Sequence, residues 1–447
     1  MARQLSTKRL YQLPPDITII SSVESPARNR IDITVETPPQ ERICPHCGSR
    51  NCIVKDSGRL QTVRHLPVAN RSVFVTFRHR RFLCKDCRAS YYEPLDWVHD
   101  RLRMTNSLVT DICLQLTEMV SIHEIAKLEH VTDETVTSVF NIISIDRPSS
   151  LPKSLCVDEF KGETGTWNPE REHWDINKFH CNITDGSAGI LIDVLPAIKK
   201  DFVADYFMQY PLEERRKVKY FCCDMHSGFI SIGKACFPDA IIRIDLFHVV
   251  NRLNMAMDAI RRRTQDSLLE DGSEESLREC KNLKNCRYKL KTKESSKEKL
   301  WGTEQTKQQA RLDHVLGLYP EICEMHDRLQ EFLVIIDTGS YARQRMDFSS
   351  WLRRSLASEV PEIRSAAATL QHWRGYIQNS WKYGQTNGPC EGINNKVKVH
   401  KRISYGVHNF DNFRKRLLLI CGPLHLIHDP AVLFRRSLNE KKGEIQL

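Results

Sequence analysis

The alternation of apolar and polar residues divides the chain into segments with different periods. Between residues 105 and 145 the apolar residues recur at helical spacing, whereas residues 154–196 hold three short apolar runs separated by polar turns. From residue 200 onward helical and strand-like segments alternate, and a long amphipathic helix is expected at 246–263. Three antiparallel strands followed by alternating helices and strands is the element order of an RNase H-like α/β fold.

Two acids stand where apolar strands of this expected fold end. Asp158 lies in the run SLCVDEF, and Asp224 follows the apolar run 218–223. The first and fourth strands are neighbours in an RNase H-like sheet, so we expect the two carboxylates to face each other. A carboxylate beside a buried strand is costly unless it binds a cation or accepts hydrogen bonds. The alternative is that both are ordinary strand-end acids in turns.

A third acid, Glu391, stands near the start of a basic, amide-rich segment, residues 389–416, that is helical by pattern. The lysines and arginines that follow it make a surface suited to a polyanion, and a lone carboxylate there could hold a divalent cation beside a phosphate. The alternative is an acid favoured by the dipole of a helix N-terminus. The highly charged, helical residues 263–371 are interpreted as an insertion that delays this last helix.

Two C-x2-C pairs lie near the start of the chain, with short alternating strands expected between them at 62–65 and 73–77. Two such turns can each present a pair of thiolates to one tetrahedral Zn²⁺, so the pattern predicts a zinc ribbon. Two unrelated pairs of buried cysteines are the alternative explanation. The expected zinc ligands are Cys44, Cys47, Cys84 and Cys87, with Cys52 or His46 as alternatives.

The segment SIHEIAKLEHVTDETVTSVFNII has the spacing of a helix-turn-helix. An apolar stripe at 122–128 is followed by a break at 129–131, after which Thr132 is expected to cap a second helix. That helix starts with two acids, which is unusual for a helix that reads DNA. A helical hairpin that serves only packing is the alternative. The residues expected to face DNA are Thr135, Thr137 and Ser138.

The charge is unevenly distributed along the chain. Lys and Arg number 66 against 56 Asp and Glu, a net charge of +10, and residues 382–447 hold twelve basic and five acidic residues, a difference of +7. This excess is typical of a phosphate-facing surface.

The length of 447 residues suggests about three domains. We expect the 16 cysteines to be reduced thiols or metal ligands in a cytosolic protein, since neither a signal peptide nor a membrane span is recognisable.

The runs VDEF, CCDMHSGF, IRIDLFHVVNRLN and EGINNKVKVHKRISYGVHNFDNFRKRLLL resemble insertion-sequence transposases of the ISL-three family, which also begin with a zinc ribbon and a helix-turn-helix. By this resemblance Asp158, Asp224 and Glu391 match a catalytic Asp-Asp-Glu triad that binds two Mg²⁺ ions, with Mn²⁺ as a substitute. The DLFH turn also matches, so Asp245 and His248 are expected to support the triad. Residues 162–175 are longer and more polar than the resemblance leads us to expect, which leaves the path of the second strand open.

The resemblance implies a transposase that binds the terminal inverted repeats of an insertion sequence, nicks the ends by metal-dependent hydrolysis and joins the 3′-hydroxyls to target DNA. It would act in the bacterial cytoplasm, at the nucleoid, as a homodimer or higher oligomer on double-stranded DNA. A metal-dependent nuclease or resolvase of the same fold is one alternative. A non-enzymatic DNA-binding regulator is another, although it would have no reason to keep three acids. The residues expected to hold phosphates are Lys396, Lys398, Lys401, Arg402, Arg414 and Arg416.

The fold class predicted from these observations is a multidomain α/β protein. Its RNase H-like catalytic domain, a mixed sheet with helices, is interrupted by an all-helical insertion and preceded by the ribbon and the helix-turn-helix. The expected parts are a zinc-ribbon DNA-binding domain at 1–100, a helix-turn-helix at 101–150, the first part of the catalytic core at 151–264, the insertion at 265–371, and the second part of the core with basic helices at 372–447.

Overall fold

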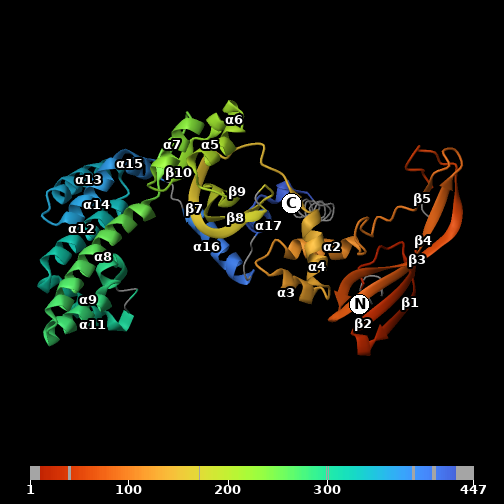
Figure 1. Ribbon diagram of the computed structural model, residues 1–447, viewed down its shortest axis with the longest axis horizontal. Helices are drawn as coiled ribbons and strands as arrows, with labels where there is room; N and C mark the ends of the chain where they lie inside the picture. Colours follow the sequence, from red (N-terminus) through yellow and green to blue (C-terminus); the bar gives the residue numbers. More distant parts are fainter. Residues whose placement is uncertain are drawn as a thin grey trace, which may run out of the picture. The chain divides into compact units, whose positions relative to one another are not determined.

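The computed structural model describes residues 11–38, 42–170, 172–297, 300, 302–384, 388–404 and 409–428 (Figure 1). The end of the basic C-terminal segment, residues 429–447, lies outside the described residues. Internal contacts divide the chain into two compact units. The first comprises Met1–Pro148, Thr166–Glu172 and Asn395–Leu447, and the second comprises Ser149–Gly165 and His173–Asn394.

The first unit starts with a five-stranded sheet. Its strands are β1 (Thr18–Ser25), β2 (Arg30–Glu36), β3 (Cys52–Val68), β4 (Arg71–Cys84) and β5 (Ser90–Tyr92), in the order β1-β2-β4-β3 with β5 paired to β4. Alternate residues Val73, Val75 and Phe77 of β4 are buried, because successive side chains of a strand point to opposite faces. The strands predicted at 62–65 and 73–77 are therefore confirmed, as parts of a longer antiparallel hairpin of β3 and β4.

Three short helices follow, and two later elements pack with them. These are α2 (Asn106–Gln115), α3 (Ile122–Leu128) and α4 (Asp133–Ile142). The Thr132 side chain accepts a hydrogen bond from the backbone N–H of Thr135, so the predicted cap is present. Leu419 of α17 (Phe410–Cys421) and Ile427 of β12 (Ile427–His428) are buried in the same core, and β12 pairs with β6 (Ser144–Ile145). The sequence did not predict that α17 would complete this core.

The second unit contains a mixed five-stranded sheet in the order β11-β10-β7-β8-β9. Its strands are β7 (Ser154–Asn168), β8 (His173–Asp185), β9 (Ile190–Leu195), β10 (Tyr220–Cys223) and β11 (Ile241–Ile244). Strands β8 and β9 are antiparallel, whereas β10 is parallel to both β7 and β11. The predicted proximity of the first and fourth strands is thus confirmed by the pairing of β7 with β10.

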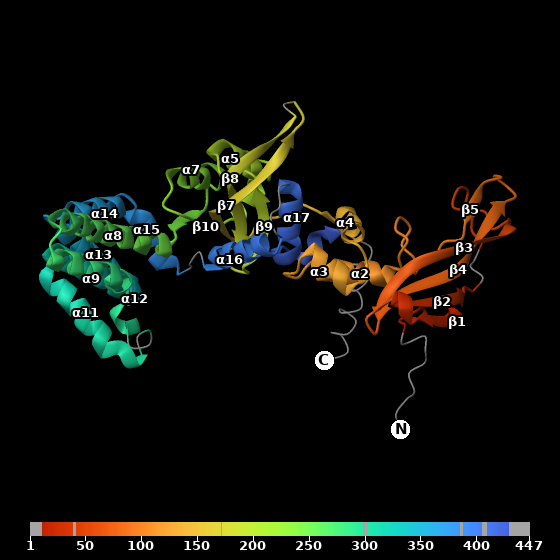
Figure 2. The same ribbon diagram turned by 60° about the horizontal axis from the view of Figure 1, so that its bottom comes forward.

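Strands β7 and β8 are longer than predicted (Figure 2). Of the polar residues 162–175, whose path the sequence left open, 162–168 extend β7 and 173–175 begin β8. Thr164 Oγ1 lies 2.6 Å from His180 Nε2, and both residues are buried, so this polar pair ties the two strands together. The sequence concealed the extension because its residues are polar and lack an apolar alternation.

The two faces of this sheet are covered differently. Leu155 and Val157 of β7 share a core with α5 (Lys200–Met208) and α7 (Ser227–Cys236). These two helices therefore cover one face of the sheet. Cys156 lies between those two residues in β7 and therefore points to the opposite face, where it packs against Cys390 in the first turn of α16 (Gly388–Ile403). That second face carries the acidic side chains discussed below. Helix α6 (Leu212–Lys217) lies between α5 and β10 in the chain.

A helical bundle follows β11 and forms the rest of the second unit (Figure 1). Helix α8 runs on to Asp271, beyond the end predicted at Arg263, because the left-handed conformation needed to stop it occurs only at Gly272 (φ 65°). The described residues between 272 and 383 contain helices and short 3-10 turns, as an all-helical segment requires. The bundle helices are α8 (Leu246–Asp271), α9 (Glu274–Cys286), α11 (Gln305–Leu318), α12 (Pro320–Asp337), α13 (Tyr341–Leu356), α14 (Pro361–His372) and α15 (Arg374–Tyr383).

Candidate active site and metal centre

Asp158 and Asp224 are brought together by the parallel pairing of β7 and β10. Cys156 and Cys222 stand opposite each other in that pairing, and each acid follows two residues later on its own strand or just beyond its end. Because side chains two residues apart share a face, both carboxylates point to the face that α16 covers. Asp158 is 6% exposed. The sequence-predicted juxtaposition of these two acids is therefore found in the structure.

The turn after β11 adds two more polar groups. Asp245 caps α8, and its Oδ1 accepts a hydrogen bond from the backbone N–H of Phe247 at 3.1 Å. One turn further, His248 Nε2 lies 3.1 Å from Asp224 Oδ1 and 3.9 Å from Asp245 Oδ2. Ligand atoms of Asp158, Asp224 and His248 all lie within 4.8 Å of one another. The sequence-predicted supporting pair, Asp245 and His248, is thus beside the two acids, and His248 is close enough to share a cation with them.

The electrostatics of this cluster favour a bound cation. Burial, followed by the negative charge of Asp158, raises the pKa of Asp224 to about 8. Burial also raises the pKa of Asp158 and that of Asp245 above their usual range. Asp224 Oδ1 is buried and accepts no hydrogen bond, despite the nearby His248 ring. Carboxylate oxygens are the ligands that Mg²⁺ prefers, and the buried Asp224 Oδ1 has no donor to compensate its charge, so these residues fit a divalent cation.

The first two turns of α16 reach the same place. Asn394 Nδ2 donates to Asp158 Oδ2 at 2.7 Å, and Asn182 Nδ2 on β8 donates to Asn394 Oδ1. Glu391 is exposed and its ligand atoms are not among the group within 4.8 Å, but its charge reaches Asp245, whose pKa is raised by burial and further by Glu391. Glu391 therefore lies near the acidic cluster, at its open side.

Two residues of this arrangement were not predicted from the sequence. Asn394 orients Asp158, and Cys390 anchors the first turn of α16 against Cys156 and Cys222. The available signal was their spacing from Glu391: Asn394 is one helical turn later, on nearly the same face. Each of the three candidate acids also has a cysteine one or two residues before it, and these three cysteines form one buried cluster.

The four cysteines of the N-terminal knuckles form a second metal-binding cluster. Cys44 Sγ lies 3.5 Å from Cys87 Sγ, and Cys47 Sγ lies 3.6 Å from Cys84 Sγ. All four sulfurs lie within 4.8 Å of one another. A tetrahedral site with Zn–S bonds of 2.3 Å has S–S edges of about 3.8 Å, so the cluster has the size of a zinc site.

Local hydrogen bonds shape both knuckles. The N–H of Gly48 donates to the carbonyl of Cys44 at 2.9 Å, and the N–H of Arg88 donates to that of Cys84 at 3.0 Å. Gly48 and Arg88 both have positive φ, 73° and 65°, so Arg88 accepts a conformation that glycine adopts at no cost. A backbone N–H of Cys87 lowers the pKa of Cys84 to about 6, whereas the neighbouring thiols raise the pKa of Cys47 and of Cys87, because the cluster without a metal does not favour several thiolates side by side.

The alternative zinc ligands are not part of the cluster. Cys52 is buried and donates its thiol to the carbonyl of Ser49, and His46 is exposed. Asp86 instead links the two knuckles, since its carboxylate accepts hydrogen bonds from Ser49 Oγ and Asn51 Nδ2. The predicted set of four cysteines is therefore the one that the structure brings together.

The residues predicted to face DNA on α4 are accessible only in part. Ser138 is exposed, whereas Thr135 and Thr137 are half-buried. The hydroxyls of Thr137 and Ser138 donate to backbone carbonyls one turn earlier, Asp133 O and Glu134 O, both at 2.8 Å. To contact DNA, each hydroxyl would have to give up its hydrogen bond to the helix backbone and donate to a base or phosphate instead.

The residues of α16 and α17 that were predicted to hold phosphates differ in exposure. Lys396, Lys398 and Arg402 are exposed, and Lys401 and Arg414 are half-buried. Arg416 differs from the prediction: it is 5% exposed, and its Nη2 donates to the carbonyls of Glu118 and Val120. It therefore fixes the loop between α2 and α3 and is not available to a phosphate on the surface. The basic pattern could not show this, because α17 turns that side toward the α2–α4 core.

Comparisons with known proteins agree with this architecture. A family model described as the ISL3 transposase matches residues 155–417, which is more than half of the chain. A second, described as the zinc-finger of transposase IS204/IS1001/IS1096/IS1165, matches residues 40–87. A protein with a mixed α/β unit, a cluster of buried acids and a four-cysteine cluster thus falls in the class of insertion-sequence transposases. The chain belongs to the ISL3 transposase family.

Individual relatives support the same class. The chain is 23% identical over 398 residues to the transposase for insertion sequence element IS1001 of Bordetella parapertussis, covering 87% of this chain and 91% of that protein. It is 24% identical over 236 residues to the transposase for IS1557 of Mycobacterium tuberculosis, covering 50% and 52%. A shorter match, 29% over 112 residues, links it to a Lactococcus lactis protein named ATP-dependent protease, of which it covers 34%.

Among the described residues, no helix is both long and apolar enough to cross a lipid bilayer.

Proposed function

We propose that the protein binds the terminal inverted repeats of an insertion sequence, nicks the element ends by metal-dependent hydrolysis and joins the resulting 3′-hydroxyls to target DNA. The observation that carries this proposal is the meeting of Asp158 and Asp224 on adjacent parallel strands, with Asn394 of α16 bonded to Asp158. The strand order, a three-strand meander extended by two parallel strands, supports an RNase H-like assignment of the sheet. Family membership supports the reaction class.

The catalytic residues in this proposal are Asp158, Asp224 and Glu391. Two Mg²⁺ ions bound there would activate the attacking oxygen and stabilise the leaving oxygen of an in-line displacement, with Mn²⁺ as a substitute. Asp158 and Asp224 supply buried oxygens from a rigid sheet, whereas Glu391 supplies one from a helix turn held by Cys390. Asn394 holds Asp158 in one orientation, and His248 lies where it can position Asp224.

Two successive displacements at phosphorus follow from one such site. In the first, a water oxygen bonds to phosphorus and the P–O3′ bond breaks, which leaves a 3′-hydroxyl and a 5′-phosphate. In the second, that 3′-oxygen bonds to a phosphorus of the target, whose own P–O3′ bond breaks, while the attacking hydroxyl gives up its proton. The number of phosphodiester bonds is unchanged in the second step, so no external energy source is needed.

Cleavage and joining of labelled end DNA test the function directly. Full-length protein with Mg²⁺ is expected to convert an end duplex first to a nicked product and then to a product covalently joined to a target plasmid. The expected dependence on the end sequence is checked with a scrambled duplex of equal length. Nicking without any joined product would instead support the nuclease or resolvase alternative, and sequence-specific binding without cleavage would support a regulator.

The exposed basic side of α16 is proposed to hold DNA phosphates rather than to read bases. Replacing Lys398, Lys401 and Arg402 together by alanine is expected to weaken binding of end and random DNA by the same factor. The slope of log affinity against log salt should become shallower by up to about 3, since each phosphate contact contributes about 0.9. Titrations at several salt concentrations measure this.

A matched control is Lys217, which is exposed and paired with Glu214 one turn away. Its replacement by alanine should leave affinity and salt slope unchanged. Loss of end preference with normal affinity for random DNA in the triple variant would mean that this side of α16 reads sequence, contrary to the assignment.

A further inference from the structure

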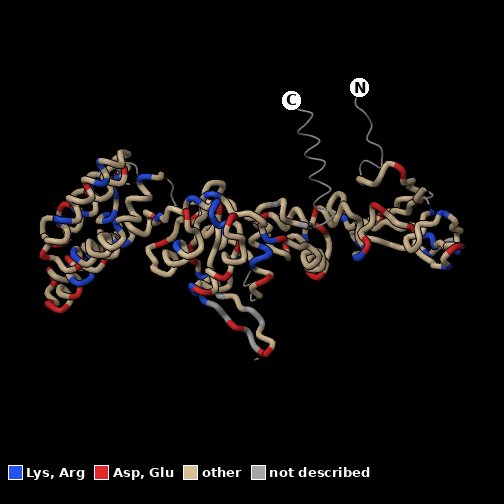
Figure 3. Tube along the Cα trace, turned by 90° about the horizontal axis from the view of Figure 1, so that it is seen from above, with Lys and Arg blue, Asp and Glu red and all other residues tan. Residues whose placement is uncertain are grey.

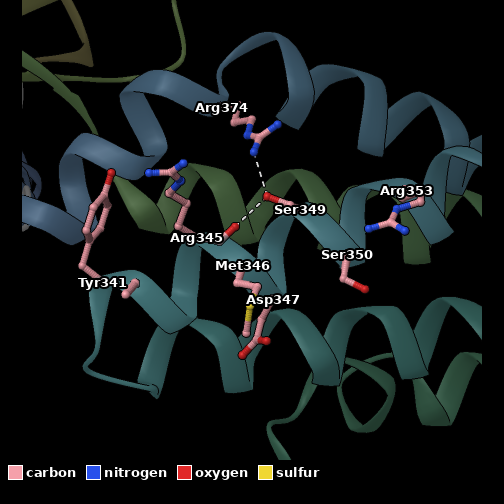
Figure 4. Close-up of a pocket in the computed structure, with 9 residues that line it drawn as sticks. Tyr341, Arg345, Met346, Asp347, Ser349, Ser350, Arg353 and Arg374 are labelled. Carbon is pink, nitrogen blue, oxygen red and sulfur yellow. Dashed lines mark hydrogen bonds between the residues drawn. The ribbon is translucent and has the colours of Figure 1, made fainter.

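An open cavity of about 780 Å³ lies in the helical bundle, and its lining includes no residue of the acidic cluster (Figure 4). Most of its lining comes from α13, and Arg374 at the start of α15 completes it. We call it the α13–α15 cleft. Its lining includes Tyr341, Arg345, Ser349, Arg353 and Arg374.

Four lining residues form a regular stripe along α13. Tyr341, Arg345, Ser349 and Arg353 follow one another at intervals of four, so they lie on one side of the helix. Each step advances about 6 Å along the axis, which spreads the stripe over roughly 18 Å. Arg374 Nη2 donates to Ser349 Oγ at 2.7 Å, and Ser349 Oγ donates to the carbonyl of Arg345 at 2.6 Å. Two helices thus contribute cations to one side of the cavity.

The arginines of the cleft lack acidic partners. Within the part of the chain that the structure describes, no ion pair is found for Arg345, Arg353 or Arg374, and all three are exposed. The only lining acid, Asp347, lies 3.6 Å from Arg343 and is directed away from Arg345 and Arg374 in Figure 4. Elsewhere along the bundle basic and acidic residues are interspersed (Figure 3). The cleft is therefore a local excess of positive charge.

Helix α15 connects this cleft to the strand beside the acids. Near its other end, Ser380 Oγ donates to the carbonyl of Ile244 at 2.6 Å and accepts from the Ile244 N–H at 3.0 Å. Ile244 directly precedes Asp245. Arg374 and Ser380 are six residues apart, or about 9 Å along the helix axis. Helix α15 thus carries Arg374 of the cleft at its start and, near its end, contacts the residue that precedes Asp245.

We propose that the α13–α15 cleft binds the phosphate backbone of DNA and so holds the strand that is processed at Asp158 and Asp224. The proposal rests on the proposed function. Guanidinium groups bind phosphate through two parallel hydrogen bonds, which makes arginine better suited to this task than lysine. Tyr341 offers a ring on which an unpaired base can stack. The helical insertion then becomes part of the DNA-binding surface.

The test compares two double variants of the full-length protein that remove equal charge from the same helix. Arg345→Ala/Arg353→Ala is expected to make the salt slope of end-DNA binding shallower by up to about 2 and to lower affinity roughly tenfold near 0.1 M salt. Arg343→Ala/Arg354→Ala is the control, because those arginines pair with Asp347 and Glu331. The control should keep the wild-type slope. Matching thermal unfolding curves would show that both variants fold.

Two binding experiments show whether the phosphates at the cleft belong to the element end or to the target DNA. Binding of a pre-nicked end duplex reports contact with the element, and capture of a target plasmid by complexes already assembled on ends reports contact with the target. A deficit of Arg345→Ala/Arg353→Ala in either arm supports the proposal and names the source. Lysine at both positions should restore most of the salt slope, since it keeps the charge.

Several results would overturn it. Equal slopes for the two double variants in both arms would do so, as would normal DNA binding with lost self-association in sedimentation, which would make the cleft a protein interface. If wild-type protein cuts and joins DNA while Arg345→Ala/Arg353→Ala binds normally, only this inference falls. If wild-type protein neither binds nor cuts end DNA, the proposed function falls first.

Discussion

Alanine at Asp158, Asp224 or Glu391 is expected to abolish both nicking and joining while leaving binding to the element ends intact. In the proposed mechanism each carboxylate helps to place a metal charge that would stabilise the transition state by several kcal/mol, so removal of one should lower the rate by about three orders of magnitude or more. Asp158 and Asp224 project from paired strands, and a neighbouring side chain has no route to replace them. A labelled end duplex assayed with Mg²⁺ and with Mn²⁺ measures both steps.

Controls can be chosen by position. Glu213 is an exposed acid at the start of α6, and Glu213→Ala should keep nearly full activity. Asp193 is a poorer control, because it is buried and accepts a hydrogen bond from the Tyr206 hydroxyl at 3.0 Å. Robust joining by Asp158→Ala would contradict the mechanism. Robust joining by Glu391→Ala would remove only that residue and direct the search to Asp245 and His248.

Thermal unfolding with and without Mg²⁺ tests metal binding at these acids separately from catalysis. Burial and the charge of Asp158 raise the pKa of Asp224 to about 8, which shows how poorly the metal-free site tolerates a second negative charge. Asp224→Asn is therefore expected to unfold at a higher temperature than wild type when no divalent cation is present. Wild type should gain thermal stability on addition of Mg²⁺, and the variant should gain much less.

The parts of the site that the sequence predicted are those determined by local patterns. The meeting of Asp158 and Asp224 was predictable because each adjoins an apolar strand, and strand order follows from the succession of elements. The zinc ligands were predictable because a C-x2-C knuckle is a local structure. Asn394 was not, since its role depends on how α16 rotates over a sheet whose first strand lies more than 200 residues earlier.

Other misses have similar causes. Arg416 looked like one more surface cation, but periodicity alone does not tell which side of a basic helix packs inward. The β7–β8 extension was missed because polar strands leave no apolar alternation. The α13–α15 cleft depends on α15 bringing Arg374 to Ser349, 25 residues away in the chain, and no sequence spacing indicates such a contact.

Removal of one zinc ligand is the second change with a large expected effect. Structural Zn²⁺ contributes about 10 kcal/mol or more to the folding of small ribbon-like domains. The knuckles of Cys44 and Cys84 are joined across the cluster mainly by their thiols and by the hydrogen bonds of Asp86. Wild-type protein should contain about one tightly bound zinc, and Cys44→Ser or Cys87→Ser should lose it together with most of the affinity for element ends.

The expected damage is confined to the ribbon. The buried core of β1–β4 lies apart from the small cluster around Cys44 and Cys84, and the acids belong to the other unit, so far-ultraviolet circular dichroism should change little. Cys52→Ser is the matched control: it removes a nearby buried thiol that is outside the four-sulfur cluster, and it should keep the metal. Metal analysis and end-binding titrations of the three variants decide the matter. Zinc retained by Cys44→Ser, or zinc lost from Cys52→Ser, would show that the ligand set is wrong; an absence of zinc from wild-type protein would contradict the ribbon itself.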